Sequence, residues 1–108
     1  MNTSPHHVTG HEVAQLLREV ITGRLKLCPE DPAHTWRQAF CGLVGFRIDG
    51  WRLQFFNDCA SLDYCDNAES PDGRTGTFQA WYDAGEEPVS LLNDSEQQAL
   101  AELFDACS

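Results

Sequence analysis

The chain has 108 residues, of which 42% are hydrophobic, 22% charged and 10% aromatic. This composition excludes disordered and collagen-like chains, and the length fits one domain of about 100–150 residues. No run approaches the ~18 consecutive apolar residues of a membrane span. Seven basic and seventeen acidic residues give a net charge of −10. That sign argues against nucleic acids and anionic membranes as partners, because both bind basic surfaces.

The charge is distributed unevenly along the chain. Residues 1–56 carry five acidic and six basic residues, a balance of +1. Residues 57–108 carry twelve acidic residues and one basic residue, a balance of −11. Acidic surface keeps small proteins apart in solution, and it also steers basic protein partners into contact. Charge alone leaves both interpretations open.

The N-terminal part predicts a tail followed by a helix. Residues 1–8 are expected to be flexible, ahead of a single domain over residues 9–108, and they lack the apolar run of a signal peptide. Thr9 and Glu12 have the spacing of a capping box, which starts a helix with an apolar stripe that ends near Gly23. The proline-containing segment that follows, residues 28–35, is predicted to be a loop.

The middle of the chain predicts antiparallel strands. Alternating residues indicate strands at 42–48 and 51–57, joined by the two-residue turn Asp49-Gly50, and a third strand at 61–66. Ser70-Pro71-Asp72-Gly73 is a turn sequence. It precedes a short strand at 75–78.

A short helix is expected at 79–84, and a final helix follows the cap sequence that begins at Asn93. The predicted fold class is α+β: an antiparallel sheet of three to four strands with an N-terminal and a C-terminal helix packed on it.

The cysteines bear on compartment and on metal binding. Five cysteines, an odd number with no C-x-x-C pair, favour reduced thiols and a cytoplasmic location. Cys41 and Cys107 lie in apolar patterns that suit buried thiols. Cys59 and Cys65 lie among aspartates and offer an alternative function, a metal- or redox-responsive site. Structural zinc needs four Cys or His ligands at compact spacing, so no metal or other cofactor is predicted.

The densest polar segment, residues 57–74, allows three interpretations. A cysteine nucleophile needs a nearby base, and His34 is the only histidine within the predicted fold; surrounding carboxylates raise a thiol pKa. A carboxylate pair for acid–base chemistry is disfavoured, because Asp63 and Asp66 should point to opposite faces of a strand. No catalytic residue is therefore assigned.

The third interpretation is a recognition surface, in which aromatic anchors are flanked by charge. Its predicted residues are Asp58, Asp63, Tyr64, Asp66, Glu69, Asp72, Arg74 and Trp81. The same aromatic residues would also suit the core. The predicted function is a non-enzymatic protein-binding module, an acidic inhibitor or immunity-type protein that covers a basic site on its partner. A homodimer is also compatible with the sequence.

Several segments of the chain resemble a known group of proteins. They are Cys41-Gly42-Leu43, Asp49-Gly50-Trp51-Arg52-Leu53, Phe56-Asn57-Asp58-Cys59, Leu62-Asp63-Tyr64-Cys65-Asp66 and Ser70-Pro71-Asp72-Gly73-Arg74. They are similar to a small uncharacterised family of acidic single-domain bacterial proteins, chiefly from pseudomonads. The resemblance covers nearly the whole chain from Val8 and implies a bacterial cytosolic setting. It carries over no catalytic residue, and it marks residues 57–74 as the most distinctive part.

Overall fold

A computed structural model describes residues 7–107 as an α+β domain. The strands over these residues are β1 (Leu27–Pro29), β2 (Gly42–Ile48), β3 (Trp51–Asp58), β4 (Ser61–Glu69) and β5 (Thr75–Thr77). The helices over the same residues are α1 (Gly10–Ile21), α2 (Trp36–Ala39), α3 (Phe78–Asp83), the 3-10 helix η1 (Val89–Leu91) and α4 (Asp94–Ala106). The predicted fold class is therefore confirmed.

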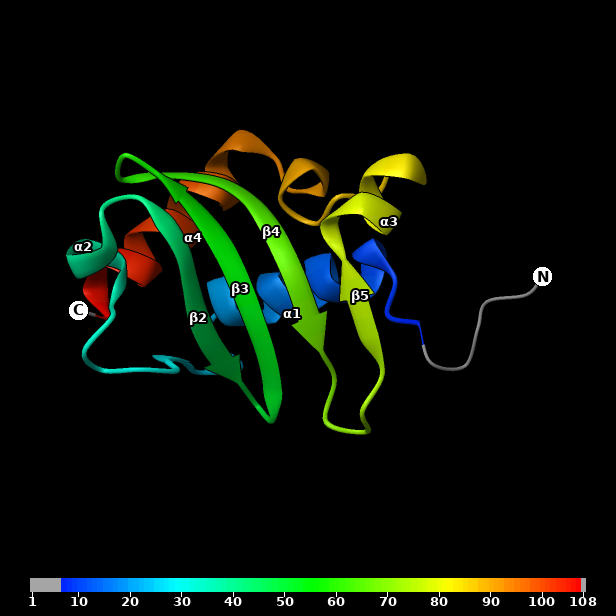
Figure 1. The fold of residues 1–108 in the computed structure, drawn as a ribbon, viewed down its shortest axis with the longest axis horizontal. Coiled ribbons are helices and arrows are strands. Elements are labelled where there is room, and N and C mark those ends of the chain that lie inside the picture. Colours follow the sequence, from blue (N-terminus) through cyan, green and yellow to red (C-terminus); the bar gives the residue numbers. More distant parts are fainter. Residues whose placement is uncertain (1–6, 108) are drawn as a thin grey trace.

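The sheet is antiparallel throughout, and the strands lie in chain order from β1 to β5 (Figure 1). The predicted Asp49-Gly50 turn joins β2 to β3, and both of its residues have the positive φ that such turns require. The expectation of three to four strands was too low, because the sheet has five. The additional strand is β1, which lies in a segment where two prolines favoured a loop. Its Pro29 is tolerated because β1 is an edge strand.

The two long helices begin where their caps predict. The Thr9 hydroxyl accepts a hydrogen bond from the Glu12 amide at 3.1 Å, and Asn93 caps α4 in the same way. Both helices lie behind the sheet in Figure 1, as the sequence predicted. The sequence did not predict α2, because a four-residue helix shows no apolar stripe.

Aromatic rings between α4 and the sheet form the centre of the core. Phe104 of α4 stacks on Phe46 of β2, with ring centroids 4.2 Å apart and an interplanar angle of 16°. Phe55 and Trp36 lie 4.8 and 5.0 Å from the Phe104 ring. All four side chains are buried, so α4 is held on the sheet by ring packing rather than by charge.

Val8 belongs to the folded domain, although the sequence placed it in a tail. It is fully buried, its amide donates to the Thr75 carbonyl at 2.8 Å, and its carbonyl accepts from the Trp81 indole at 2.9 Å. Gly76 makes this approach possible, because a Cβ there would lie 2.6 Å from the Trp81 ring. Residues 1–6 of the predicted tail lie outside the described residues.

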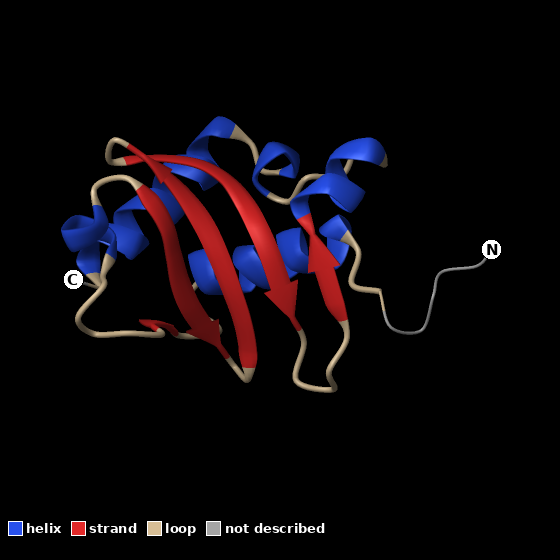
Figure 2. Cartoon of the chain, in the orientation of Figure 1, coloured by secondary structure: helices blue, strands red, loops and turns tan. Residues whose placement is uncertain are grey.

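The opposite face of the sheet is left uncovered. In Figure 2 the long helices lie behind the strands and no helix crosses in front of β2 and β3. Among residues 7–107, no helix combines the length and the apolar character that crossing a membrane requires. The uncovered face is therefore a regular surface on which a site can be built.

Replacing Phe104 tests the central packing. Phe104→Ala should lower the free energy of unfolding by about 3–5 kcal/mol, because it removes a ring that three others contact. Urea denaturation measures this loss. Tyr82→Ala, which truncates an exposed ring, should cost less than about 1 kcal/mol. A loss below about 1 kcal/mol for Phe104→Ala would contradict the packing described here.

Candidate functional site

The uncovered face, hereafter the open face, is built by strand alternation. Leu53 and Phe55 of β3 point into the core, so Arg52, Gln54 and Phe56 point outward. Residues opposite them on β4 share this face, since Asn67 pairs with Gln54 and Tyr64 with Phe56. The alternation in 51–57 was visible in the sequence, but it did not show which face the helices would leave open.

Two irregularities in β4 bring acidic residues to the open face. Gln54 and Phe55 of β3 pair with Asn67 and Cys65, so Asp66 is an extra residue opposite them. In the same way Asp63 is an extra residue where Phe56 and Asn57 pair with Tyr64 and Leu62, so it has no pairing residue on β3. Such β-bulges change the direction of side chains.

The two bulge carboxylates act on the same phenol. Partial burial raises the pKa of Tyr64, and the charges of Asp66 and Asp63 raise it further. The expectation that the two aspartates point to opposite faces assumed a regular strand, which β4 is not. Tyr64 consequently keeps its proton at neutral pH and remains a hydrogen-bond donor.

Aromatic side chains form a continuous row across the open face and onto α3, which we call the aromatic row. The Phe56 and Tyr64 rings stack with centroids 5.3 Å apart at 13°. Phe78 follows at 4.4 Å from Tyr64, and Tyr82 at 5.5 Å from Phe78. The first three rings are half-buried, and Tyr82 is 65% exposed. Of these rings, sequence reasoning assigned only Tyr64 to a site.

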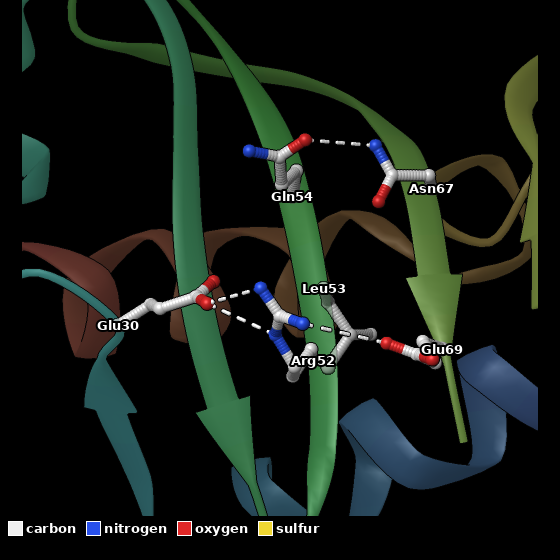
Figure 3. A pocket seen from close by; sticks show the side chains of 6 residues that line it. All are labelled: Glu30, Arg52, Leu53, Gln54, Asn67 and Glu69. Carbon is white, nitrogen blue, oxygen red and sulfur yellow. Dashed lines mark hydrogen bonds and ion pairs between the residues drawn. The ribbon is translucent and has the colours of Figure 1, made fainter. Parts of the chain in front are cut away.

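A polar hollow lies on β3 and β4, where Gln54 and Asn67 line it together with Arg52 and Glu69 (Figure 3). Arg52 reaches between two carboxylates there: Glu30 accepts hydrogen bonds at 2.7 and 2.9 Å, and Glu69 lies 3.5 Å away. Gln54 accepts a hydrogen bond from Asn67 at 2.9 Å. The hollow measures about 200 Å³, which is below the roughly 300 Å³ at which ligand pockets begin.

A second hollow of about 360 Å³ continues from the first toward His34 and Leu43. The His34 Nε2 atom lies 2.9 Å from the Leu43 carbonyl oxygen. Within residues 7–107, His34 makes no hydrogen bond with a cysteine. The pair of histidine and thiol that nucleophilic catalysis needs is therefore not formed by the hydrogen bonds of the described chain.

Two of the predicted binding residues, Arg74 and Asp72, also make contacts within the fold. Arg74 donates to both carboxylate oxygens of Glu12, at 3.2 and 3.0 Å, and to Asp72 within the β4–β5 turn. Asp72 also accepts a hydrogen bond from Ser70. Arg74 and Asp72 thus join the turn to the start of α1.

Trp81 is another predicted binding residue, and the fold buries it completely. Its indole donates to Val8 inside the domain, so a partner that docks on the surface does not reach it. The remaining predicted residues, Asp58, Asp63, Tyr64, Asp66 and Glu69, are at least partly accessible and lie on β3 or β4. The structure therefore concentrates the predicted surface on one side of the sheet.

Cys65, one half of the cysteine alternative, points into the core. Its amide donates to the buried carboxylate of Glu87 at 2.9 Å. Burial, and then the charges of Glu87 and Asp66, raise the pKa of the Cys65 thiol far above its usual range. Glu87 also accepts from the amides of Val89 and Ser90, so it organises the start of η1.

Cys59 lies instead against Cys41, with the two sulfur atoms 3.1 Å apart. Both residues are exposed, so the apolar pattern around Cys41 wrongly indicated a buried thiol. No group of three or more His, Cys, Asp and Glu side chains within residues 7–107 is arranged to hold a metal ion. A redox role for Cys59 and Cys65 stays a prediction, and the thiol found next to Cys59 is that of Cys41.

A family model described as a domain of unknown function, DUF7693, matches residues 7–106. The chain belongs to the DUF7693 family. This membership agrees with the resemblance to a small uncharacterised single-domain family, and it assigns no activity. The matched range includes every strand and helix given above, so the open face lies within the DUF7693 domain. No curated protein and no solved structure gives a significant match.

The Arg74 ion pairs predict a pH-dependent contribution to stability. Partial burial raises the pKa of Glu12, but hydrogen bonds from Thr9 and Arg74 outweigh it and lower the pKa overall. Ser70 and Arg74 lower the pKa of Asp72. Because both pKa values are lower in the folded state, the stabilisation is present near neutral pH and disappears as the pH falls through those lowered values.

Arg74→Gln should therefore lower the free energy of unfolding at pH 7, because it removes the hydrogen bonds to Glu12 and Asp72. Chemical denaturation of both proteins at pH 7 and near pH 3 should show the difference shrinking as the two carboxyls take up protons. Arg24→Gln is the control, because Arg24 is 75% exposed and lies 3.7 Å from Glu19. A difference that stayed constant between the two pH values would rule out this ion-pair origin.

Proposed function

We propose that the protein is a non-enzymatic binding module whose open face covers a basic surface on another protein. The observation that carries the proposal is the aromatic row lying beside the carboxylates of the two β4 bulges. Buried aromatic contacts supply much of the energy of protein interfaces, and flanking charges select the partner and speed association. This combination is the one an acidic inhibitor or immunity-type protein needs.

The aromatic row supplies anchors that are already held in place. Each ring contacts the next, so Phe56, Tyr64 and Phe78 lose little side-chain freedom when a partner covers them. Tyr82 is exposed at the end of the row and gains the most from burial. Pre-ordered rings of this kind bind a surface better than freely rotating ones.

The charges favour a basic protein over other classes of partner. Asp63 and Asp66 lie on β4 beside the row, and the chain carries a net charge of −10. Rows of aromatic residues also bind single-stranded nucleic acids, but those sites rely on a positively charged groove to hold phosphates. An acidic border repels phosphates and attracts lysine and arginine side chains.

The polar hollow on β3 and β4 fits the same interpretation. Its cation, Arg52, is already bound to Glu30 and lies close to Glu69, so it is not available to hold an anionic small molecule. The walls are polar, and the volume of about 200 Å³ suits a single inserted side chain. We propose that a partner inserts a polar or basic side chain there, against Glu69 and Gln54.

We also propose a bacterial cytoplasmic setting for this interaction. The odd number of five cysteines, which favours a reducing compartment, supports the cytoplasmic location, and the resemblance of several segments to bacterial proteins supports the bacterial origin.

Neutralising the two bulge carboxylates tests the proposal. The immobilised wild type, Asp63→Asn/Asp66→Asn and Asp49→Asn/Glu102→Gln proteins are exposed to lysate of the source organism at low and moderate salt. Each double variant removes two negative charges, but only the first removes them beside the aromatic row. We expect a basic protein to bind the wild type and the control, and to be lost from the bulge variant.

Titration calorimetry with the purified partner then measures the effect. The bulge variant should weaken Kd about tenfold with a shallower salt dependence, and Tyr82→Ala should weaken it at every salt concentration. If the three immobilised proteins all retain the same lysate proteins, the bulge carboxylates do not contribute to binding and the proposed surface is wrong. Light scattering that showed a wild-type dimer disrupted by Tyr82→Ala would identify a second copy as the partner instead.

A further inference from the structure

We propose that Cys41 and Cys59 form a reversible intramolecular disulfide when the protein meets a small-molecule disulfide such as oxidised glutathione. The proposed function makes no use of these residues, and the proposal does not depend on it. Cys41 lies immediately before β2, and Cys59 lies in the two-residue turn between β3 and β4. Both thiols are exposed, so an oxidant in solution reaches them.

The two sulfur atoms are already in contact. They lie 3.1 Å apart, and a disulfide bond is about 2.05 Å long, so closure needs an approach of about 1 Å. The residues are 18 positions apart in the chain, so their meeting is a product of the fold rather than of local sequence. Cys28 and Cys107 donate hydrogen bonds to the backbone carbonyls of Arg47 and Leu27, while partial burial raises the pKa of the Cys107 thiol and the charge of Cys28 raises it further.

Hydrogen bonds hold the two cysteine-bearing segments together. The Ala60 amide donates to the Phe40 carbonyl at 2.9 Å and to the Asn57 side chain at 2.7 Å. Asn57 is fully buried, and its amide group donates to the Trp36 carbonyl at 3.0 Å. One buried side chain therefore fixes the turn that carries Cys59 against the segment that carries Cys41.

The backbone beside the thiols adopts an unfavourable conformation. Four non-glycine residues within 7–107 have positive φ, and three of them, Phe40, Cys59 and Ala60, flank the sulfur pair. A two-residue turn of this type favours Asn-Gly, yet this chain has Cys-Ala. Strain that persists only because surrounding contacts impose it is typical of functional positions. The strained turn keeps the Cys59 thiol beside Cys41.

The chemistry is a two-step thiol–disulfide exchange. The Cys41 thiolate attacks one sulfur of oxidised glutathione, which forms a mixed disulfide and releases glutathione thiolate. The Cys59 thiolate then attacks the Cys41 sulfur, which forms the intramolecular bond and releases the second glutathione. Two protein thiols are oxidised, one glutathione disulfide is reduced to two thiols, and the protons from the cysteines pass to them.

The surroundings set the order of the two steps. A hydrogen bond with Cys41 raises the pKa of the Cys59 thiol, the charge on Cys41 raises it further, and Asp58 adds to the effect. Cys59 therefore holds its proton more strongly than an isolated thiol does, which suits the resolving thiol better than the thiol that attacks glutathione. Oxidation should accordingly become faster as the pH rises above neutrality.

The experiment equilibrates the full chain with glutathione buffers of increasing oxidised fraction and blocks the remaining thiols by alkylation. Mass spectrometry should show the loss of two hydrogen atoms and three alkylated cysteines of the five. After trypsin digestion without reductant, peptide 38–47 should be joined to peptide 53–74, and fragmentation should place the bond at Cys59 rather than Cys65. Excess dithiothreitol should restore both thiols.

Thermal unfolding supplies a second readout. The oxidised wild type should show a Tm about 5–10 °C above that of the reduced form, because the cross-link restricts the unfolded chain. Cys59→Asn is the sharpest variant, since asparagine suits the positive φ of this turn while it removes the thiol. It should fold and show no oxidation-dependent shift, whereas Cys28→Ser should behave as wild type.

Other products would overturn the proposal. They are glutathione mixed disulfides alone, a bond between Cys28 and Cys107, dimers joined through exposed cysteines, and unchanged thiols in the most oxidising buffer. Peptide mapping of the wild type distinguishes all of them, so the conclusion does not depend on how any variant folds. None of these outcomes bears on the aromatic row, which is tested separately through Tyr82 and the bulge carboxylates.

Discussion

The packing of Phe104 against the inner face of the sheet is the interaction on which the rest of the structure depends. Its ring stacks on Phe46 and contacts Phe55 and Trp36, and this packing places α4 behind β2 and β3. The ion pair between Arg18 of α1 and Glu96 of α4, at 3.1 Å, joins the two long helices on that side. Because both helices pack on the same face of the sheet, no helix covers the side chains on the other face of β2 and β3. The open face is therefore a consequence of one-sided packing, and its chemistry depends on which residues the strands direct outward.

Regular alternation alone would place one outward residue of β4 opposite each outward residue of β3. The two bulges add Asp66 and Asp63 to this pattern without moving the inward residues Ala68 and Cys65 from the core. The sheet thus gains two carboxylates beside Tyr64 and keeps its hydrophobic packing. The cation of the nearby hollow, Arg52, is bound to Glu30 rather than to either of these two carboxylates. Two carboxylates therefore lie beside a row of half-buried rings that ends at the exposed Tyr82.

Local signals in the sequence predicted most of the elements. The capping boxes of α1 and α4, the Asp49-Gly50 turn and the alternation of β2 and β3 all act within a few residues, so they are readable without the fold. Features that depend on contacts between residues far apart in the sequence could not be predicted from local patterns. Strand β1 exists because Pro29 and its neighbours pair with the edge of β2, and Trp81 is buried because Val8 and Gly76 come together around it. Contact between Cys41 and Cys59 depends on the buried Asn57, whose role no local pattern indicates.

The departures from local rules are concentrated near one another in the sheet. Most of the chain agrees with its local preferences, as expected of a sequence that folds to one structure. The exceptions are the bulges of β4 and the Cys59-Ala60 turn that leads into the same strand. Asn-Gly at that turn and a regular β4 would satisfy local preferences better, so folding alone does not account for either choice. The carboxylates set beside Tyr64 and the thiol set beside Cys41 are what these departures produce. We therefore expect function at β4 and the turn before it, because the bulges and the positive-φ turn are both locally unfavourable.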